Sequence, residues 1–172
     1  MTGAGRTIRK TSARAGQDLR DLVQGVLVAE LLAPSRDFWL VSPWVSDVAV
    51  IDNSDGSFNG LDPNWPAQGV GLLQVLVALV TAGSKVWLET RPDDHNKRFV
   101  DRLMSSTGGH GVAVRYSPVL HEKGMAGETF VISGSMNFTI NGLFLLDEAV
   151  RLDTDADAVA QARIAFKARW SS

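Results

Sequence analysis

The sequence predicts an α/β sandwich in which helices flank a mixed central sheet. Apolar segments with helical spacing alternate along the chain with short, continuous apolar runs of the length of buried strands. Glycine or proline follows most of these segments, as is typical at the boundaries of helices and strands. A chain of 172 residues, of which 45% are hydrophobic and 21% charged, is long enough for one domain with a proper core.

Four segments have the features of helices. Leucine and valine recur at helical spacing in the first, which Pro34 stops, and Gly83 follows the second as a typical C-terminal residue. The third and fourth open with aspartates, and the fourth carries its basic residues late, as the helix dipole favours. We therefore expect helices at residues 17–32, 70–82, 92–104 and 155–170.

The other apolar runs have the features of strands. In one of them, His121 and Lys123 are two residues apart, so strand alternation places both side chains on one face. The next run leads into a turn of small residues at 134–137, which presents a hydroxyl and a carboxamide. We expect strands at 38–41, 85–90 and 112–116, a strand that carries His121 and Lys123, a strand at 128–133, and a last strand that Glu148 opens.

Residues 46–68 form a long polar segment rich in Asp, Asn, Gly and Pro. The segment does not fit the calcium-binding loop of an EF-hand, because Gly56 is out of place counted from Asp52 and no glutamate closes the loop. A segment of this length in a compact domain is usually functional or mobile. Two alternatives stay open, a lid or specificity wall over the site and a disordered surface loop.

Basic residues concentrate near the N-terminus, although the net charge of the chain is −2. We interpret residues 1–16 as a basic arm that precedes a single domain at 17–172. An arm of this kind on an acidic body could reach a phosphate backbone through Arg9 and Lys10. The alternative is a solvated, frayed terminus.

The absence of cysteine excludes disulfides and thiolate metal sites, and it is compatible with a reducing cytosol. No apolar signal segment opens the chain, and the longest apolar run, 70–82, is too short to span a bilayer. We therefore expect a cytoplasmic protein without a transmembrane segment. His95 and His110 have no partners at metal-ligand spacing, so neither a metal nor another cofactor is expected.

One constellation of polar residues suits phosphate chemistry. Lys123 supplies positive charge to a tetrahedral oxyanion, while Ser135 and Asn137 supply neutral hydrogen bonds. His121 is the member of this set that can act as a nucleophile or proton carrier near neutral pH.

This pattern resembles the HKD signature of the phospholipase D superfamily. The sequence departs from that signature in two ways. Glu128 stands where the family usually has Asp, and five residues rather than six separate Glu128 from the Gly-Ser pair at 134–135. We assign Glu128 a structural or supporting role. In single-motif bacterial nucleases of the family, a glutamate eleven residues after the motif Asn supports the catalytic His, and Glu148 lies at that offset. A weaker resemblance to restriction-associated and repair-associated members lies at Ser42-Pro-Trp44, which makes Ser42 and Trp44 candidate substrate-binding residues.

The resemblance implies a metal-independent phosphodiesterase in which His121 forms a covalent phosphohistidine. Lys123 and Asn137 would hold the nonbridging oxygens, Ser135 would add a hydrogen bond, and Glu148 would fix the tautomer of the histidine. The chain carries one motif where a family active site needs two, which implies a homodimer with a shared site. Small single-motif members are commonly nucleases, so the resemblance favours DNA or RNA as substrate and implies an anti-phage or restriction system, with other defence proteins as partners.

Two alternatives of different classes remain. A phospholipid phosphodiesterase would need an exposed apolar rim, for which Trp44, Phe58 and Trp65 are the candidates. A noncatalytic assembly subunit of a defence complex would account for Glu128 and for the shortened interval.

Overall fold

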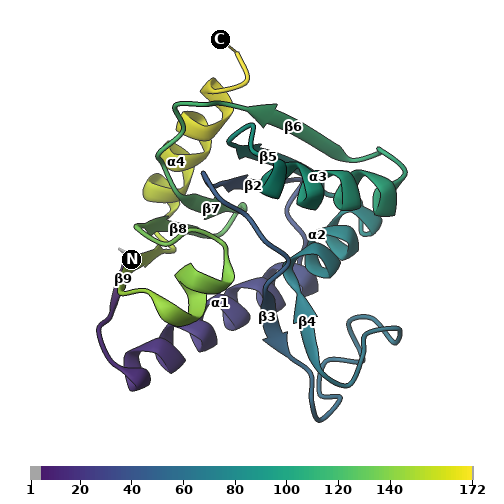
Figure 1. Cartoon of the computed structure of the whole chain (residues 1–172), viewed down its shortest axis with the longest axis vertical. Helices are drawn as coiled ribbons and strands as arrows, with labels where there is room; N and C mark the ends of the chain where they lie inside the picture. Colours follow the sequence, from purple (N-terminus) through teal and green to yellow (C-terminus); the bar gives the residue numbers. More distant parts are fainter. Residues whose placement is uncertain (1–4, 172) are drawn as a thin grey trace.

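The computed structural model describes residues 5–171, with the backbone alone for Ala13, and shows a seven-stranded sheet with helices on both faces (Figure 1). The strands lie in the order β1-β9-β8-β7-β2-β5-β6. β2, β5 and β6 run parallel and the other neighbouring pairs run antiparallel, so the predicted mixed sheet is confirmed. The strands are β1 Arg6–Lys10, β2 Asp37–Val41, β5 Lys85–Thr90, β6 Val112–Tyr116, β7 Gly124–Ala126, β8 Val131–Gly134 and β9 Glu148–Asp153.

Alternating side chains along β2 show how the two faces are covered. Phe38 and Leu40 belong to the larger core, which three helices close, whereas Trp39 and Val41 belong to a smaller core under the fourth helix. The three helices are α1 Ala13–Leu32, α2 Leu72–Thr81 and α3 Asp94–Thr107, and the fourth is α4 Ala156–Ala168. Within the described residues, none of these helices has both the length and the apolar character needed to cross a bilayer.

The four predicted helices are confirmed, and capping groups explain their ends. Asp93 and Asp155 each accept backbone N–H bonds from the first turn of their helix. Gly108 ends α3 in the left-handed conformation, with φ of 62°. α1 begins before the predicted residue 17, because Ser12 caps its first turn.

The predicted strands at 85–90 and 112–116 are confirmed, but the strand expected to carry the motif histidine is shorter. His121 and Lys123 precede β7 rather than lie in it. The reason is that β2 ends at Val41, opposite Gly124, and offers no further partner for the ladder. The expected alternation of the two cations on one strand face is therefore wrong.

β1 and the π-helix η1 Asn141–Leu145 were not predicted, and neither were the two short strands of the hairpin described below. β1 pairs along its whole length with β9. Its five residues include a single apolar side chain, Ile8, so pairing with a distant strand outweighs a weak local propensity. The basic segment expected as an arm or frayed terminus thus contains an edge strand and the start of α1.

Within β1, the two candidate substrate-binding cations differ in their exposure to solvent. Arg9 is exposed, whereas Lys10 is buried and its Nζ donates to the carbonyl of Gly142, 3.0 Å away. Burial lowers the pKa of Lys10, against an opposing effect of the Glu148 carboxylate. Because its ammonium group anchors the start of η1, the structure gives the expected contact of Lys10 with substrate no support. The contact expected of Arg9 stays a prediction.

The polar segment at 46–68 belongs to a small hairpin of β3 Ala49–Asp52 and β4 Gly69–Gly71. The buried Asn53 side chain donates to the side chain of Asn59 and to the carbonyl of Pro66, which holds the turns between the two strands together. Ser46, at the start of the segment, lines one of the two clefts described below, but none of residues 47–68 does, so the structure gives a lid or specificity wall formed by the segment no support.

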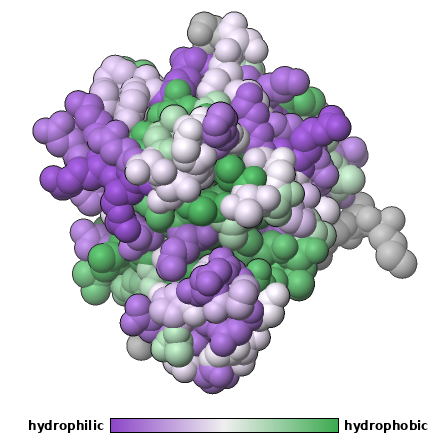
Figure 2. Space-filling view, turned by 90° about the vertical axis from the view of Figure 1, so that its right-hand side faces the viewer, coloured by the Kyte–Doolittle hydropathy of each residue, from purple (hydrophilic) through white to green (hydrophobic). Residues whose placement is uncertain are grey.

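Figure 2 shows this hairpin as a mostly hydrophilic projection at the bottom, with hydrophobic surface between it and the body of the protein. A groove of about 560 Å³ lies there, lined by Leu61 and Trp65 of the hairpin and by Leu73 and Val77 of the α2 region. Trp65 is only 6% exposed. It therefore anchors the hairpin to the core and is not part of an exposed apolar rim.

Candidate active site

The candidate residues converge because of the order and direction of the strands. β2 and β5 run parallel and β7 runs antiparallel to β2, so the start of β7 lies beside the ends of β2 and β5. The end of β8 and the start of β9 reach the same edge, since β7, β8 and β9 are successive antiparallel neighbours. Residues far apart in the sequence, from Ser42 to Glu148, are thereby brought to the edge of the sheet that is formed by the ends of β2, β5 and β8 and the starts of β7 and β9.

At this edge, His121, Lys123 and Ser135 line one open cleft of about 470 Å³. The side chain of His121 is exposed, and the Nζ of Lys123 donates to the His121 carbonyl at 2.6 Å. Burial lowers the pKa of Lys123, the positive charge of Arg91 lowers it further, and Glu148 raises it. An imidazole, an ammonium group and a hydroxyl therefore face one space that is open to a ligand.

The Gly-Ser pair of the motif fits between β8 and β9. Gly134 has φ of 146°, and a Cβ atom there would collide with the carbonyl of Ala149. Ser135 Oγ donates to Glu148 Oε2 and accepts from the N–H of Ala149 at 3.0 Å. The buried Glu148 carboxylate thus orients the serine, and within residues 5–171 it makes no hydrogen bond to the His121 ring.

Asn137 lies in a second cleft, of about 550 Å³, which it shares with Trp44 and His95. Its Oδ1 atom is buried and has no hydrogen-bond partner among the described residues. The motif asparagine therefore keeps an unused acceptor two residues beyond Ser135. In the single protomer, the candidate residues are divided between two neighbouring clefts.

Glu128 lies at the opposite end of the β7–β8 hairpin from His121. Its carboxylate accepts from the N–H of Arg36 at 3.2 Å, and its own N–H donates to Ser35 Oγ at 2.7 Å. The register pairs Gly124 with Ser133, so the turn at 127–130 absorbs the shortened interval and the motif residues still meet. The departure from Asp to Glu is thus remote from the cleft.

Of the two candidates at the end of β2, only one is accessible. Ser42 is fully buried, its Oγ donates to the carbonyl of Trp44 at 2.7 Å, and it accepts from the N–H of Phe138 at 3.3 Å. The structure therefore gives the expected contact of Ser42 with substrate no support. Trp44 is 37% exposed and lines the second cleft.

Arg91 is a cation near the site that the sequence analysis missed. It follows β5, and its Nε donates to the carbonyl of Leu120 at 2.8 Å, directly before His121. Its charge also contributes to the lowered pKa of Lys123. The signal that could have found it is its position just after a buried strand whose end meets this edge of the sheet.

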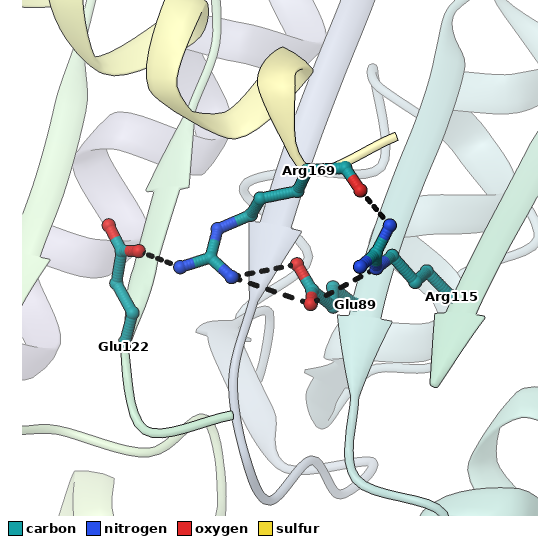
Figure 3. A network of polar contacts seen from close by, with 4 residues as sticks. All are labelled: Glu89, Arg115, Glu122 and Arg169. Atoms are coloured by element: carbon teal, nitrogen blue, oxygen red, sulfur yellow. Dashed lines mark hydrogen bonds and ion pairs between the residues drawn. The ribbon is translucent and has the colours of Figure 1, made fainter. Parts of the chain in front are cut away.

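A second missed feature is an ionic network that ties the end of α4 to the histidine loop (Figure 3). The Glu89 carboxylate, 1% exposed, contacts Arg169 at 3.2 Å and Arg115 at 3.5 Å. Arg169 also pairs with Glu122, the neighbour of His121. The loop that carries His121 is thereby held in place by Arg169, which lies close to the C-terminal end of the sequence.

Within residues 5–171, no group of three or more His, Cys, Asp or Glu side chains is placed to hold a metal ion. His95 and His110, both exposed, belong to no such group. His95 instead lies within hydrogen-bond distance of a hydroxyl, with its Nε2 2.9 Å from Ser46 Oγ.

No family model matches the sequence, and no curated protein matches it. Solved structures are similar in fold. NucT from Helicobacter pylori has a TM-score of 0.66 at 12% identity, over 98% of this chain and 96% of NucT. Nuc from Salmonella typhimurium, a phospholipase D family member, has a TM-score of 0.60 at 14% identity, over 98% of this chain and 94% of Nuc. A polyphosphate kinase from Porphyromonas gingivalis has a TM-score of 0.63 at 14% identity, over 95% of this chain and 25% of the kinase.

The first two similarities extend over almost the whole of both chains, so they concern the complete arrangement of strands and helices rather than one motif. The seven-stranded mixed sheet between α1–α3 and α4 agrees with the fold expected from the motif at residues 121–137. The chain therefore has the α/β fold of NucT and of Nuc, a member of the phospholipase D family.

Proposed function

We propose that this protein is a metal-independent phosphodiesterase that cleaves DNA or RNA. The observation that carries the proposal is the open cleft in which His121, Lys123 and Ser135 meet at one edge of the sheet. The fold likeness to Nuc, together with the HKD-like motif, supports membership of the phospholipase D superfamily. The cleft combines a nucleophile with groups that bind an oxyanion, as phosphoryl transfer requires.

The reaction proceeds in two displacements. A neutral His121 attacks the phosphorus atom, the bond to the departing oxygen breaks, and a protonated second imidazole gives that oxygen a proton. Water then attacks phosphorus, its proton returns to the second imidazole, and the bond between phosphorus and His121 breaks. Two imidazoles in unlike protonation states predict a bell-shaped dependence of rate on pH.

The second imidazole comes from a second copy of the chain. A single protomer offers one motif histidine, and its exposed position at the mouth of the cleft is compatible with a twofold-related partner. Lys123 and Asn137 of both copies bind the nonbridging oxygens, and Ser135 adds a hydrogen bond. Oε2 of Glu148 is engaged by Ser135, which leaves Oε1 to accept from the imidazole and fix its tautomer.

Among the alternatives, phospholipid hydrolysis loses two of its three supporting residues. Trp65 is buried, and Phe58 is partly buried and packed against the core, so neither forms part of an exposed rim with Trp44. The hypothesis of a noncatalytic assembly subunit also loses support, because Glu128 and the shortened interval, which suggested it, lie away from the cleft that His121 lines. A setting in anti-phage or restriction defence remains part of the proposal.

The proposal is tested with purified protein, in EDTA, on supercoiled plasmid, single-stranded DNA, RNA and phosphatidylglycerol vesicles. We expect cleavage of nucleic acid and no turnover of lipid. Sedimentation of the same preparation is expected to show a dimer. Turnover of lipid alone would support the lipid alternative, and a folded protein that turns over none of these substrates would support the assembly subunit.

The effect of Arg91 on Lys123 gives a prediction about charge in the cleft. Arg91→Gln removes a positive charge that disfavours the protonated form of Lys123, so the pKa of Lys123 is expected to rise. Because burial remains the larger cause, the pKa is expected to stay below the ordinary value for lysine. The charged form then persists to higher pH than in the unmodified protein.

This shift is measured by ¹³C NMR titration of lysine Cε atoms, with the Lys123 signal assigned through Lys123→Arg. Arg91→Lys keeps the charge and is expected to leave the titration nearly unchanged. Arg98→Gln removes an exposed arginine of α3 that does not contribute to the Lys123 shift, and serves as the control. A Lys123 pKa that stays constant in Arg91→Gln would show that Arg91 does not act on the cleft.

A further inference from the structure

The second cleft is a feature that the proposed chemistry leaves largely unexplained. It is open, has a volume of about 550 Å³ and is built from three separate parts of the chain. Trp44 and Ser46 follow β2, His95 comes from the first turn of α3, and the remaining lining residues follow β8. Those remaining residues are Asn137, Thr139, Ile140, Asn141 and Leu146.

The backbone that carries Trp44 is fixed by three fully buried polar side chains. Ser42 Oγ donates to the carbonyl of Trp44 at 2.7 Å. Asn96 accepts from the N–H of Val45 at 3.0 Å and donates to the carbonyl of Pro43 at 2.8 Å, which Thr90 also approaches at 3.3 Å. The backbone position of Trp44 is therefore set before any ligand arrives, which reduces the entropy cost of binding.

Trp44 is the most exposed of the five tryptophans. It is 37% exposed, whereas Trp39 and Trp65 are buried and Trp87 and Trp170 are partly buried. The His95 ring contacts it edge-on, with 6.4 Å between centroids and an interplanar angle of 68°. Because the two rings are steeply inclined, they do not stack face to face, and an exposed indole in this arrangement can offer a face to a flat ligand.

The polar groups of the cleft also suit a heteroaromatic ligand. Ser46, Thr139 and Asn141 contribute hydrogen-bonding groups to its lining. Ile140 and Leu146, both exposed, add apolar surface to the cleft, but an acyl chain there would leave the polar groups without partners, at a cost in free energy. A nucleobase has both a π-face for Trp44 and edge groups for the polar side chains.

The two clefts are close enough for one nucleotide to occupy both. Ser135 lines the first cleft and Asn137 lines the second, and two extended residues span at most about 7 Å. A phosphate beside His121 and Ser135, held by Asn137 at the border of the two clefts, would leave its own base within reach of the cleft that Trp44 lines.

We propose that the second cleft binds an unpaired nucleobase next to the scissile phosphate, stacked on Trp44, so that the substrate is single-stranded nucleic acid. This inference rests on the proposed nuclease function and names its substrate class. In a duplex, each base is already stacked and paired, so it could enter the cleft only after leaving the helix, which costs free energy.

Binding is tested in a His121→Ala background, which keeps the substrate intact, by fluorescence anisotropy of labelled oligonucleotides in EDTA. Trp44→Ala is expected to weaken single-strand binding by about 10- to 100-fold, and Trp44→Phe to retain most of it. Tyr116→Ala removes another exposed aromatic residue, at the end of β6 and outside both clefts, and is expected to change nothing. An oligonucleotide with an abasic site at the stacked position should lose affinity for the background protein and none for the Trp44→Ala variant.

The outcomes separate the base site from the nuclease proposal. If nucleic acid is cleaved by the unmodified protein but Trp44→Ala, shown by circular dichroism to be folded, binds single strands as tightly as the background, the base site is wrong and the nuclease stands. Equal binding of duplex and single strands would also overturn the base site. Trp44-dependent binding to phosphatidylglycerol vesicles instead of oligonucleotides would assign the cleft to an acyl chain. Failure of the unmodified protein to bind or cleave any nucleic acid would remove both proposals.

Discussion

Replacing His121 with alanine is expected to reduce EDTA-resistant cleavage of nucleic acid by about 10⁴-fold or more, because the variant has neither a nucleophile nor a general acid. His121 is exposed at the mouth of its cleft, so the substitution should leave the free energy of unfolding nearly unchanged. His110→Ala is the matched control, since His110 is exposed in a loop after α3 and lines neither cleft. Initial rates on a fluorescent oligonucleotide measure both variants.

Mixing experiments extend this prediction to the shared active site. If every site needs His121 from two protomers, activity should fall with the square of the fraction of unmodified chains once subunits have exchanged with His121→Ala. If each protomer acted alone, activity would fall in proportion to that fraction. A linear decrease in a mixture shown to exchange subunits would contradict the shared site and leave the fold assignment untouched.

Glu89→Gln is expected to lower the free energy of unfolding by on the order of 3 kcal/mol, because it removes the buried carboxylate that Arg115 and Arg169 both contact. Glu89 is 1% exposed, while the side chains of Arg115 and Arg169 are 34% and 27% exposed, so part of their charge remains solvated. Gln keeps the size of the side chain and so isolates the effect of charge from that of a cavity. Urea denaturation at neutral pH measures the change.

Glu122→Gln provides the comparison within the same network, since it removes a second, more exposed carboxylate that Arg169 contacts (Figure 3). The Glu122 side chain is 46% exposed, so its ion pair is expected to contribute at most about 1 kcal/mol. Equal losses for Glu89→Gln and Glu122→Gln would show that burial of Glu89 does not set the strength of the network.

Much of the fold follows from local signals in the sequence. Helical spacing of leucine and valine, with aspartate caps at residues 93 and 155, placed the helices because capping and periodicity act within a few residues. The apolar strands at 85–90 and 112–116 were found for the same reason. β1 was missed because a strand of mostly basic and polar residues forms only through its pairing with β9.

In the candidate site, too, some features followed from local sequence and others depended on contacts between distant residues. The spacing of the motif brought His121, Lys123 and Ser135 together in the prediction, and they line one cleft in the structure. The burial of Lys10 and Ser42 could not be predicted, because it depends on contacts with Gly142 and Phe138, which lie 132 and 96 residues away along the chain. Arg91 was missed since its approach to Lys123 depends on the order of strands.

By itself, the sequence determined the class of fold, the four helices and the set of groups available for phosphate chemistry, since these depend on residue type and short-range spacing. Only the tertiary structure decided which of those groups reach solvent and how they are divided between two clefts. The physical reason is that burial, strand register and the contacts of Glu89 and Trp44 depend on partners that folding brings together from distant parts of the chain.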